Sequence, residues 1–252
     1  MRDNFVVHPH YSQLENELQK ALQNFSKNDE YVTQGQRNVI KKVAIDGVTF
    51  NIKKFKTPNT FQSVVYRFLR KNKAMRSFEY AKRLIESGIN TPFPVAYSES
   101  FSAGLTDSYY ISQHLDYDFD FRELIHNPKF ENRDEILKQF TRFTFKLHEN
   151  NVNFLDHSPG NTLIVVNKND NPQYEFYLID LNRMWFEPMN FDKRMHNFRR
   201  LWLSKKMIQV MSKEYAELYG KPYEEVHALM SKYSRQFQKK INSKKLRRRR
   251  RK

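Results

Sequence analysis

The sequence predicts an α+β protein of two lobes, a small N-terminal lobe of β-sheet plus helix and a mostly helical C-terminal lobe. The first observation is a stretch of β-branched and aromatic residues at 38–55, which is interrupted by Asp46-Gly47, a dipeptide typical of hairpin turns. The second is apolar spacing of helical period, which dominates the chain after residue 134. The 252 residues suffice for two units of about 100 to 150 residues, each with its own core.

The N-terminal lobe is predicted to span residues 31–115, after a helical extension at residues 1–30. In the extension, leucines and a phenylalanine recur at helical spacing, which indicates an amphipathic helix. Gly88 is expected to end the last helix of the lobe, because glycine tolerates the backbone that closes a helix. The expected elements are a helix at 11–25, two strands within 38–55, a two-part helix at 59–88, and strands at 93–97 and 108–115.

The C-terminal lobe is predicted to span residues 116–238 and to be followed by a basic tail at 239–252. It begins with an acidic and aromatic run at 116–120, which we interpret as the junction between the lobes. The two tryptophans, Trp185 and Trp202, are expected in its core rather than as platforms for a sugar. The expected elements are helices near Arg122 and at 134–149, strands at 162–166 and 174–179, and helices at 191–218 and 222–241.

The net charge of +16 is concentrated at the C-terminus. The last 14 residues contain ten basic and no acidic residues, so the other 238 carry only +6. We expect a flexible polycation that binds anionic lipid head groups, nucleic acid or another acidic surface. The alternative is a solvated tail with no specific ligand.

Composition excludes several classes of protein. Without cysteine, the chain has no disulfide framework, iron-sulfur centre or thiolate zinc site, which agrees with a reducing compartment. The longest apolar run, Leu163 to Val166, is far below the roughly 18 residues of a membrane-spanning helix. The N-terminus lacks the pattern of a secretory signal, so we expect a cytoplasmic protein. No H-E-x-x-H zinc motif or G-x-S-x-G hydrolase motif is found.

The segment from Asp156 to Asp180 carries the clearest chemical pattern. A polar loop with Asp156 and Asn161 is followed by a strand, a turn, a second strand and then Asp180. Asn161 and Asp180 are expected to be cross-strand neighbours about 5 Å apart, as a pair of oxygen ligands for Mg²⁺. Asp156 is placed to accept a proton. A pair of Mg²⁺ ligands beside a proton acceptor indicates phosphoryl transfer. The alternative is that Asp156 only caps and Asn161 only forms a turn.

These residues resemble the protein-kinase-like superfamily. Asp156 to Asn161 matches the D-x-x-x-x-N part of the catalytic loop, and Asp180-Leu181-Asn182 stands where Asp-Phe-Gly would. The resemblance implies a protein-kinase-like fold with a nucleotide-binding lysine and a helix glutamate that orients it. Lys53, in Ile52-Lys53, resembles that lysine, with Lys54 as the alternative, and Glu79 resembles the glutamate.

The nucleotide loop departs from the protein-kinase pattern. Kinases have three glycines over the phosphates, whereas this chain has only Gly35, so Arg37 is expected to help cover them. The resemblance places further nucleotide contacts at Gln113 and Leu115. Phe154-Leu155 replaces the His-Arg that precedes the catalytic aspartate, which argues against a conventional regulated protein kinase.

The combination of motifs is similar to the lipopolysaccharide core kinases, the Kdo and heptose kinase family of Gram-negative envelopes. The resemblance implies transfer of the γ-phosphate of ATP, with Mg²⁺, to a sugar hydroxyl of the inner core at the cytoplasmic face of the inner membrane. Kdo is preferred over heptose on overall similarity, so the expected acceptor is lipid-linked, as in Kdo-lipid A. The resemblance to this family is carried by segments 73–80, 88–94, 156–161 and 179–183, and it extends over about residues 31–202.

Two other functions compete with a sugar kinase. A catalytically weak kinase-fold scaffold would tolerate the loss of several of the five matching residues, and all five are present. A nucleic-acid-binding protein would act through the basic tail, but the charge of +6 on the rest of the chain disfavours it. The pattern leaves the oligomeric state open.

Overall fold

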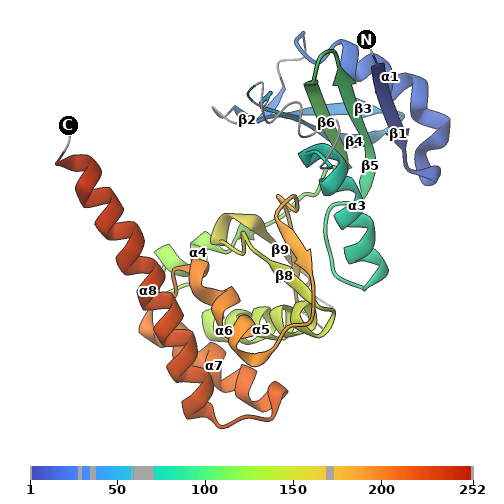
Figure 1. The fold of residues 1–252 in the computed structure, drawn as a ribbon. Coiled ribbons are helices and arrows are strands. Elements are labelled where there is room, and N and C mark those ends of the chain that lie inside the picture. Colours follow the sequence, from blue (N-terminus) through green and yellow to red (C-terminus); the bar gives the residue numbers. More distant parts are fainter. Residues whose placement is uncertain are drawn as a thin grey trace. The chain divides into compact units, whose positions relative to one another are not determined.

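The chain folds into two compact units, Met1–Asp116 and Tyr117–Lys252. A computed structural model describes residues 2–27, 30–34, 38–57, 59, 71–168 and 173–250 (Figure 1). Each unit has its own hydrophobic core and is described by itself.

Unit 1 is built on a six-stranded antiparallel sheet of order β1-β5-β6-β4-β3-β2. The predicted hairpin at 38–55 is confirmed, because Ile45 and Val48 are the last paired residues on either side of Asp46-Gly47. Both turn residues have positive φ, 47° and 76°, as a two-residue hairpin loop requires. The strands are β1 (Arg2–Val7), β2 (Tyr31–Gln34), β3 (Asn38–Ile45), β4 (Val48–Phe55), β5 (Pro94–Phe101) and β6 (Leu105–Gln113).

The two faces of this sheet are covered by different helices. On one face, Leu18 of α1 (Glu15–Gln23) packs against Phe50 and Ile52 of β4. On the other, Ala74 and Phe78 of α3 (Lys73–Glu86) pack against Phe55 and Tyr97. Successive residues of β4 therefore point to opposite layers, as the pleat of a strand dictates.

The N-terminal extension is not purely helical. Arg2–Val7 forms the edge strand β1, which pairs with β5, and Pro9–Leu14 forms the short 3₁₀ helix η1 before α1 begins at Glu15. Phe5, Val6 and Val7 are good strand formers, so the prediction of a helical extension over 1–30 was wrong for its first residues. The first part of the predicted helix at 59–88 lies outside the described residues. Its second part is α3, and Gly88 with φ of 68° follows its end as predicted.

Unit 2 is mostly helical, with two small antiparallel sheets of order β10-β9-β7 and β11-β8. The predicted hairpin at 162–179 is present as β9 and β10. The strands are β7 (Phe119–Asp120), β8 (Val152–Phe154), β9 (Thr162–Val166), β10 (Tyr174–Leu178) and β11 (Met184–Phe186), and the helices are α4 (Arg122–His126), α5 (Arg133–Glu149), η2 (Pro159–Asn161), α6 (Phe191–Asn197), η3 (Phe198–Leu201), α7 (Lys205–Tyr219) and α8 (Tyr223–Arg249).

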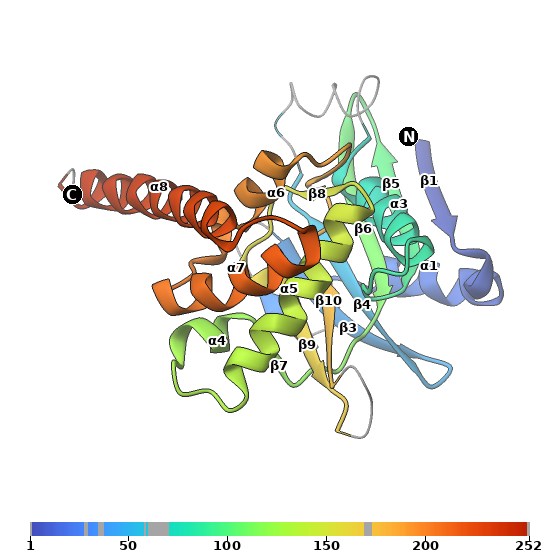
Figure 2. The ribbon, with the colours of Figure 1, turned by 90° about the horizontal axis from the view of Figure 1, so that it is seen from below.

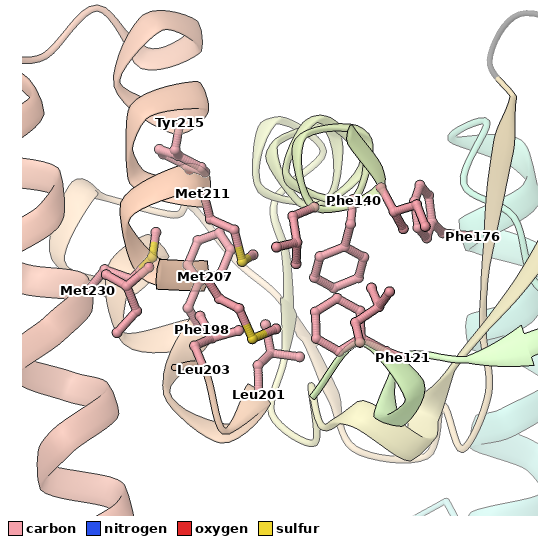
Figure 3. Close-up of a cluster of buried hydrophobic side chains, with 14 of the residues drawn as sticks. Phe121, Phe140, Phe176, Phe198, Leu201, Leu203, Met207, Met211, Tyr215 and Met230 are labelled. Carbon is pink, nitrogen blue, oxygen red and sulfur yellow. The ribbon is translucent and has the colours of Figure 1, made fainter. Parts of the chain in front are cut away.

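The core of unit 2 lies between α5 and the later helices (Figure 3). Phe140 of α5 is fully buried, and its ring centroid lies 4.3 Å from that of Phe121 and 5.4 Å from that of Phe176. Methionines from α7 and α8 fill the opposite side. Their flexible side chains adapt to the irregular space where three helices meet.

The single helix predicted at 191–218 is divided into α6, η3 and α7. Trp202 has a left-handed backbone with φ of 57°, which ends η3. The side chain of Ser204 then accepts a hydrogen bond from the amide of Met207, so a new helix begins there.

The basic tail is helical through Arg249. α8 runs unbroken for 27 residues, so the prediction of a flexible segment from Lys239 was wrong for most of it. Its sequence contains no glycine or proline, and basic residues in the last turns interact favourably with the helix dipole. Val226 and Met230 are buried in the core, and the C-terminal half extends beyond α5, α6 and α7 (Figures 1 and 2).

None of the helices in the described part of the chain has the length and apolar character required to cross a membrane.

Candidate active site

The loop that follows β8 brings Asp156 and Asn161 together. The side-chain amide of Asn161 donates from Nδ2 to the backbone oxygen of Asp156 over 2.8 Å. This bond fixes the amide so that its other atom, the acceptor Oδ1, is left for a ligand. This hydrogen bond closes the loop, which presents the carboxylate of Asp156 and the amide oxygen of Asn161.

Two arginines hold the carboxylate of Asp156. Arg200 Nη2 lies 2.8 Å from Oδ1, and Arg183 Nη1 lies 3.5 Å from Oδ2. Asp156 is mostly shielded, with 23% of its side chain exposed. Sequence reasoning missed Arg200, since it lies 44 positions further along the chain and only the packing of η3 brings it to the loop.

Asp180 lies one residue beyond its expected position in the hairpin. Thr162 is paired with Leu178, and the amide of Ile179 donates to the oxygen of Asn161, so Ile179 rather than Asp180 is the cross-strand neighbour of Asn161. Asp180 has a left-handed backbone with φ of 62°. This conformation is unfavourable for most residues and is often found at functional sites.

A buried polar network anchors the loop to the helical core. Asn197 of α6 accepts a hydrogen bond from His157 Nδ1 over 2.9 Å, and its Nδ2 donates to Asn153 Oδ1 and to the backbone oxygen of Phe154. His157 is fully buried, and burial lowers its pKa to about 4. A second buried histidine, His148, has its pKa lowered to about 3, chiefly by desolvation and then by the charge of His157.

Gly160 permits a close approach within the same loop. A Cβ atom at this position would lie 1.7 Å from Nη2 of Arg122, whose Nη1 pairs with Asp120 over 2.6 Å. Any larger residue would displace this arginine. The loop is thus held on one side by Asn197 and bordered on the other by Arg122.

Lys53 of β4 lies on the sheet face covered by α3, the same face as Phe55 two positions later. Its Nζ is 5.3 Å from the centre of the Phe55 ring, and Nζ of Lys73 is 6.0 Å from the same ring. Desolvation, and after it the charge of Lys73, lower the pKa of Lys53 to about 8. Burial disfavours the charged form of this lysine, and the neighbouring cation disfavours it further.

Lys54, the alternative lysine, points to the opposite face. It forms an ion pair of 2.8 Å with Asp107 and lies against the ring of Tyr109. Glu79 of α3 is bound by Lys71, whose Nζ is 2.7 Å from each carboxylate oxygen. The pairing of Lys53 with Glu79 stays a prediction.

The remaining predicted nucleotide contacts are placed as follows. The side chain of Gln113 is hydrogen-bonded to the hydroxyl of Tyr11, on the sheet face opposite to Lys53, so only its backbone is suited to the predicted contact. Leu115 is half-buried in the segment after β6. Gly35 and Arg37 lie outside the described residues.

The oxygen atoms of Asn161 and Asp180 fit a magnesium ion whose remaining ligands are water and phosphate oxygens. Among the residues that the structure describes, no group of three or more His, Cys, Asp or Glu residues is arranged to hold a metal. Mg²⁺ does not require such a cage, since it is usually bound by one or two protein oxygens, with water and phosphate completing the octahedron. Asn161 Oδ1 and the carboxylate of Asp180 are donors of this kind.

Trp185 lies at the surface near this loop. It has 59% of its surface exposed, so the prediction that it belongs to the core was wrong. Along the three-residue strand β11, Met184 is buried and Phe186 is half-buried, whereas Trp185 between them points to the opposite, exposed face. Trp202 packs against Phe237, with their ring centroids 5.9 Å apart.

Comparison with known proteins identifies relatives of this chain. The model of the lipopolysaccharide kinase (Kdo/WaaP) family matches residues 21–222. No curated protein matches the sequence. The structure of WaaP in complex with acyl carrier protein is similar, with a TM-score of 0.65 and 17% identity, over 95% of this chain and 99% of that one. A Rio2 kinase-ADP/Mg²⁺-phosphoaspartate complex from Chaetomium thermophilum has a TM-score of 0.48 and 15% identity, over 87% and 67%.

The likeness to the WaaP structure shows that the fold is the two-lobed, protein-kinase-like α+β fold that the sequence predicted. In that fold, unit 1 is the sheet lobe and unit 2 the helical lobe.

Acidification is expected to destabilise the protein through its buried histidines. Both have a folded pKa far below the unfolded value of 6.5, so the unfolded state binds more protons as the pH falls from 6.5 towards 4. The free energy of unfolding should then decrease by about 1.4 kcal/mol per pH unit for each histidine. The free energy of unfolding, measured by urea denaturation between pH 7 and pH 4.5, should depend less steeply on pH in His157→Gln than in the wild type. The exposed His126→Gln is the matched control, and an unchanged slope in His157→Gln would contradict the assignment.

The two lysines of β4 are expected to differ in function. Lys53→Met removes the desolvated cation on the α3 face and should lower turnover by about 10²-fold or more, with an unchanged unfolding midpoint. Lys54→Met removes only the pair with Asp107 and should leave turnover within about threefold, since exposed pairs contribute little. Steady-state kinetics with varied ATP separates the two. An inactive Lys54→Met beside a normal Lys53→Met would reverse the assignment.

Proposed function

Since the chain belongs to the lipopolysaccharide kinase (Kdo/WaaP) family, we propose that it transfers the γ-phosphate of ATP to a hydroxyl of a Kdo sugar in the lipopolysaccharide inner core. Membership of this family makes the protein a phosphotransferase, and the acceptor and donor are the proposal. The observation that supports it most directly is the convergence of Asp156, Asn161 and Asp180 on one loop and hairpin.

Asp156 is the proposed base. Its carboxylate accepts a hydrogen bond from the attacking hydroxyl and takes the proton while the sugar oxygen bonds to the γ-phosphorus and ADP departs. The short ion pair with Arg200 limits the rotation of the carboxylate, so its position does not depend on the substrate. Asn197 secures the same loop from within the core.

Asn161 and Asp180 are the proposed ligands of Mg²⁺. When bound, the ion neutralises charge on the phosphates of the nucleotide and aligns them for transfer. The hydrogen bond from Asn161 Nδ2 to Asp156 links the metal ligand to the base, because a shift of one moves the other.

Lys53 is the proposed phosphate-binding lysine. Its pKa of about 8 means that much of the unfavourable burial is relieved when a phosphate oxygen binds the ammonium group. Phosphate binding and the protonation of Lys53 are therefore mutually favourable.

The basic end of α8 is the proposed attachment to the cytoplasmic face of the inner membrane, where a lipid-linked acceptor would reside. Residues 239–252 hold ten cations and no acid, and α8 carries those up to Arg249 beyond the core of unit 2. Near an anionic membrane each basic residue contributes about 1 kcal/mol at most, so ten suffice to bind a soluble protein.

The proposed function is tested by incubating the protein with Kdo-lipid A, ATP and Mg²⁺ and measuring the mass of the product for one added phosphate. Asp156→Asn keeps the size of the side chain but removes the base, so transfer should fall by about 10²-fold or more while Mg²⁺-dependent ATP binding is retained. Asp180→Asn should weaken that ATP binding. Wild-type turnover in Asp156→Asn would exclude the assigned base, and absence of the phosphorylated product with the wild type would exclude Kdo-lipid A as the acceptor.

Truncation after Gln238 tests the membrane proposal. The core contacts of α8 precede this position, so the shortened protein should fold and keep its turnover on a soluble Kdo glycoside. Co-sedimentation with anionic vesicles should fall at low salt, and activity on Kdo-lipid A in those vesicles should fall with it. Equal co-sedimentation of the two proteins would contradict the proposal. Tight duplex DNA binding that is lost on truncation would favour the nucleic-acid alternative instead.

A further inference from the structure

The surroundings of Asp156 are rich in positive charge. Guanidinium groups of two arginines contact its two oxygens. Arg199 adds a further cation beside Arg200, and desolvation together with the charge of Arg200 lowers the pKa of Arg199. Among the acids near these arginines in the sequence, Glu187 pairs with Lys193 and Asp192 accepts from the hydroxyl of Tyr233, whereas Asp180, three positions before Arg183, belongs to the same candidate site.

The two arginines are held differently. Arg200 is 30% exposed, forms the short contact with Asp156, and its guanidinium lies 5.6 Å from the centre of the Phe237 ring of α8. Arg183 is 60% exposed and lies 3.5 Å from Asp156, which is longer than a good charge-assisted hydrogen bond of about 2.8 Å. Arg200 is therefore a fixed support, whereas Arg183 can reach a second anion without leaving the base unsupported.

An exposed aromatic ring adjoins Arg183. The amide of Leu155 donates to the oxygen of Arg183 over 3.0 Å, which extends the pairing of β11 with β8 to this residue. Arg183 lies at a bend directly before β11, two positions before Trp185. The segment thus presents a cation and a flat apolar surface next to the residue that precedes Asp156.

We infer that Arg183 and Arg200, with Trp185 beside them, form the acceptor subsite and bind an acidic sugar through an anionic group close to its reacting hydroxyl. The planar guanidinium group of arginine suits a carboxylate or phosphate, to which it can donate two parallel hydrogen bonds. The apolar side of a sugar ring packs on the indole. This inference rests on the proposed function and refines it: a Kdo residue carries a carboxylate, whereas an unmodified heptose carries no charge.

The inference is tested first by kinetics on Kdo-lipid A in detergent. Arg183→Gln should raise the KM for the acceptor at least tenfold, with kcat and the KM for ATP within about twofold of the wild type. Arg183→Lys keeps the charge but not the planar guanidinium group, so its KM for the acceptor should lie between those of the wild type and Arg183→Gln. Exposed Arg235→Gln on α8 is the matched control. A change in kcat alone would mean that Arg183 only orients Asp156, and it would overturn the inference.

A binding measurement separates this inference from the proposed function. In a Trp202→Phe background, the fluorescence of Trp185 reports the subsite directly. The methyl glycoside of Kdo should change it saturably, its methyl ester and a neutral heptose should not, and Arg183→Gln should abolish the response. A response to a heptose phosphate instead would identify phosphate as the anion. If the Kdo glycoside binds in an Arg183-dependent way but no phosphate is transferred, the subsite stands and the proposed reaction is wrong. If the Kdo glycoside, its methyl ester and the heptose bind equally, the subsite is wrong.

Discussion

The buried amide of Asn197 connects the catalytic loop to the helical core of unit 2. It uses Oδ1 for His157 and Nδ2 for both Asn153 and the backbone of Phe154, so one side chain fixes the strand that enters the loop and the residue that follows Asp156. Each of these groups is removed from water, where an unmade hydrogen bond costs about 1 to 3 kcal/mol. The positions of the base and of Asn161 therefore depend on the packing of α6 against the core.

Both units place cations where a negatively charged molecule is expected. In unit 1 the desolvated Lys53 lies with Lys73 around Phe55, and in unit 2 two arginines contact Asp156. A phosphate or carboxylate bound at either place would interact favourably with these cations. This electrostatic design suits a reaction in which both substrates are anions, and it links the nucleotide proposal to the acidic-acceptor inference.

Much of the fold follows from local pattern, and the errors have specific causes. The hairpin of β3 and β4, the end of α3 before Gly88 and the helix α5 were predicted because turn chemistry and apolar period act over a few residues. The one-residue error at Asp180 arose because the register of β9 and β10 is set by their pairing and packing. The uniform spacing around residue 202 concealed the break between η3 and α7.

The sequence by itself determined the two-lobed fold class and most of the longer helices and strands, and it singled out Lys53, Asp156, Asn161 and Asp180 as candidates for the chemistry. Only the tertiary structure decided that Arg200 contacts Asp156, that Asn197 secures the loop, and that Trp185 is exposed. The physical reason is range. Periodicity and turns are encoded by neighbours in the chain, whereas these contacts join residues about 30 to 45 positions apart that meet only when the helices pack.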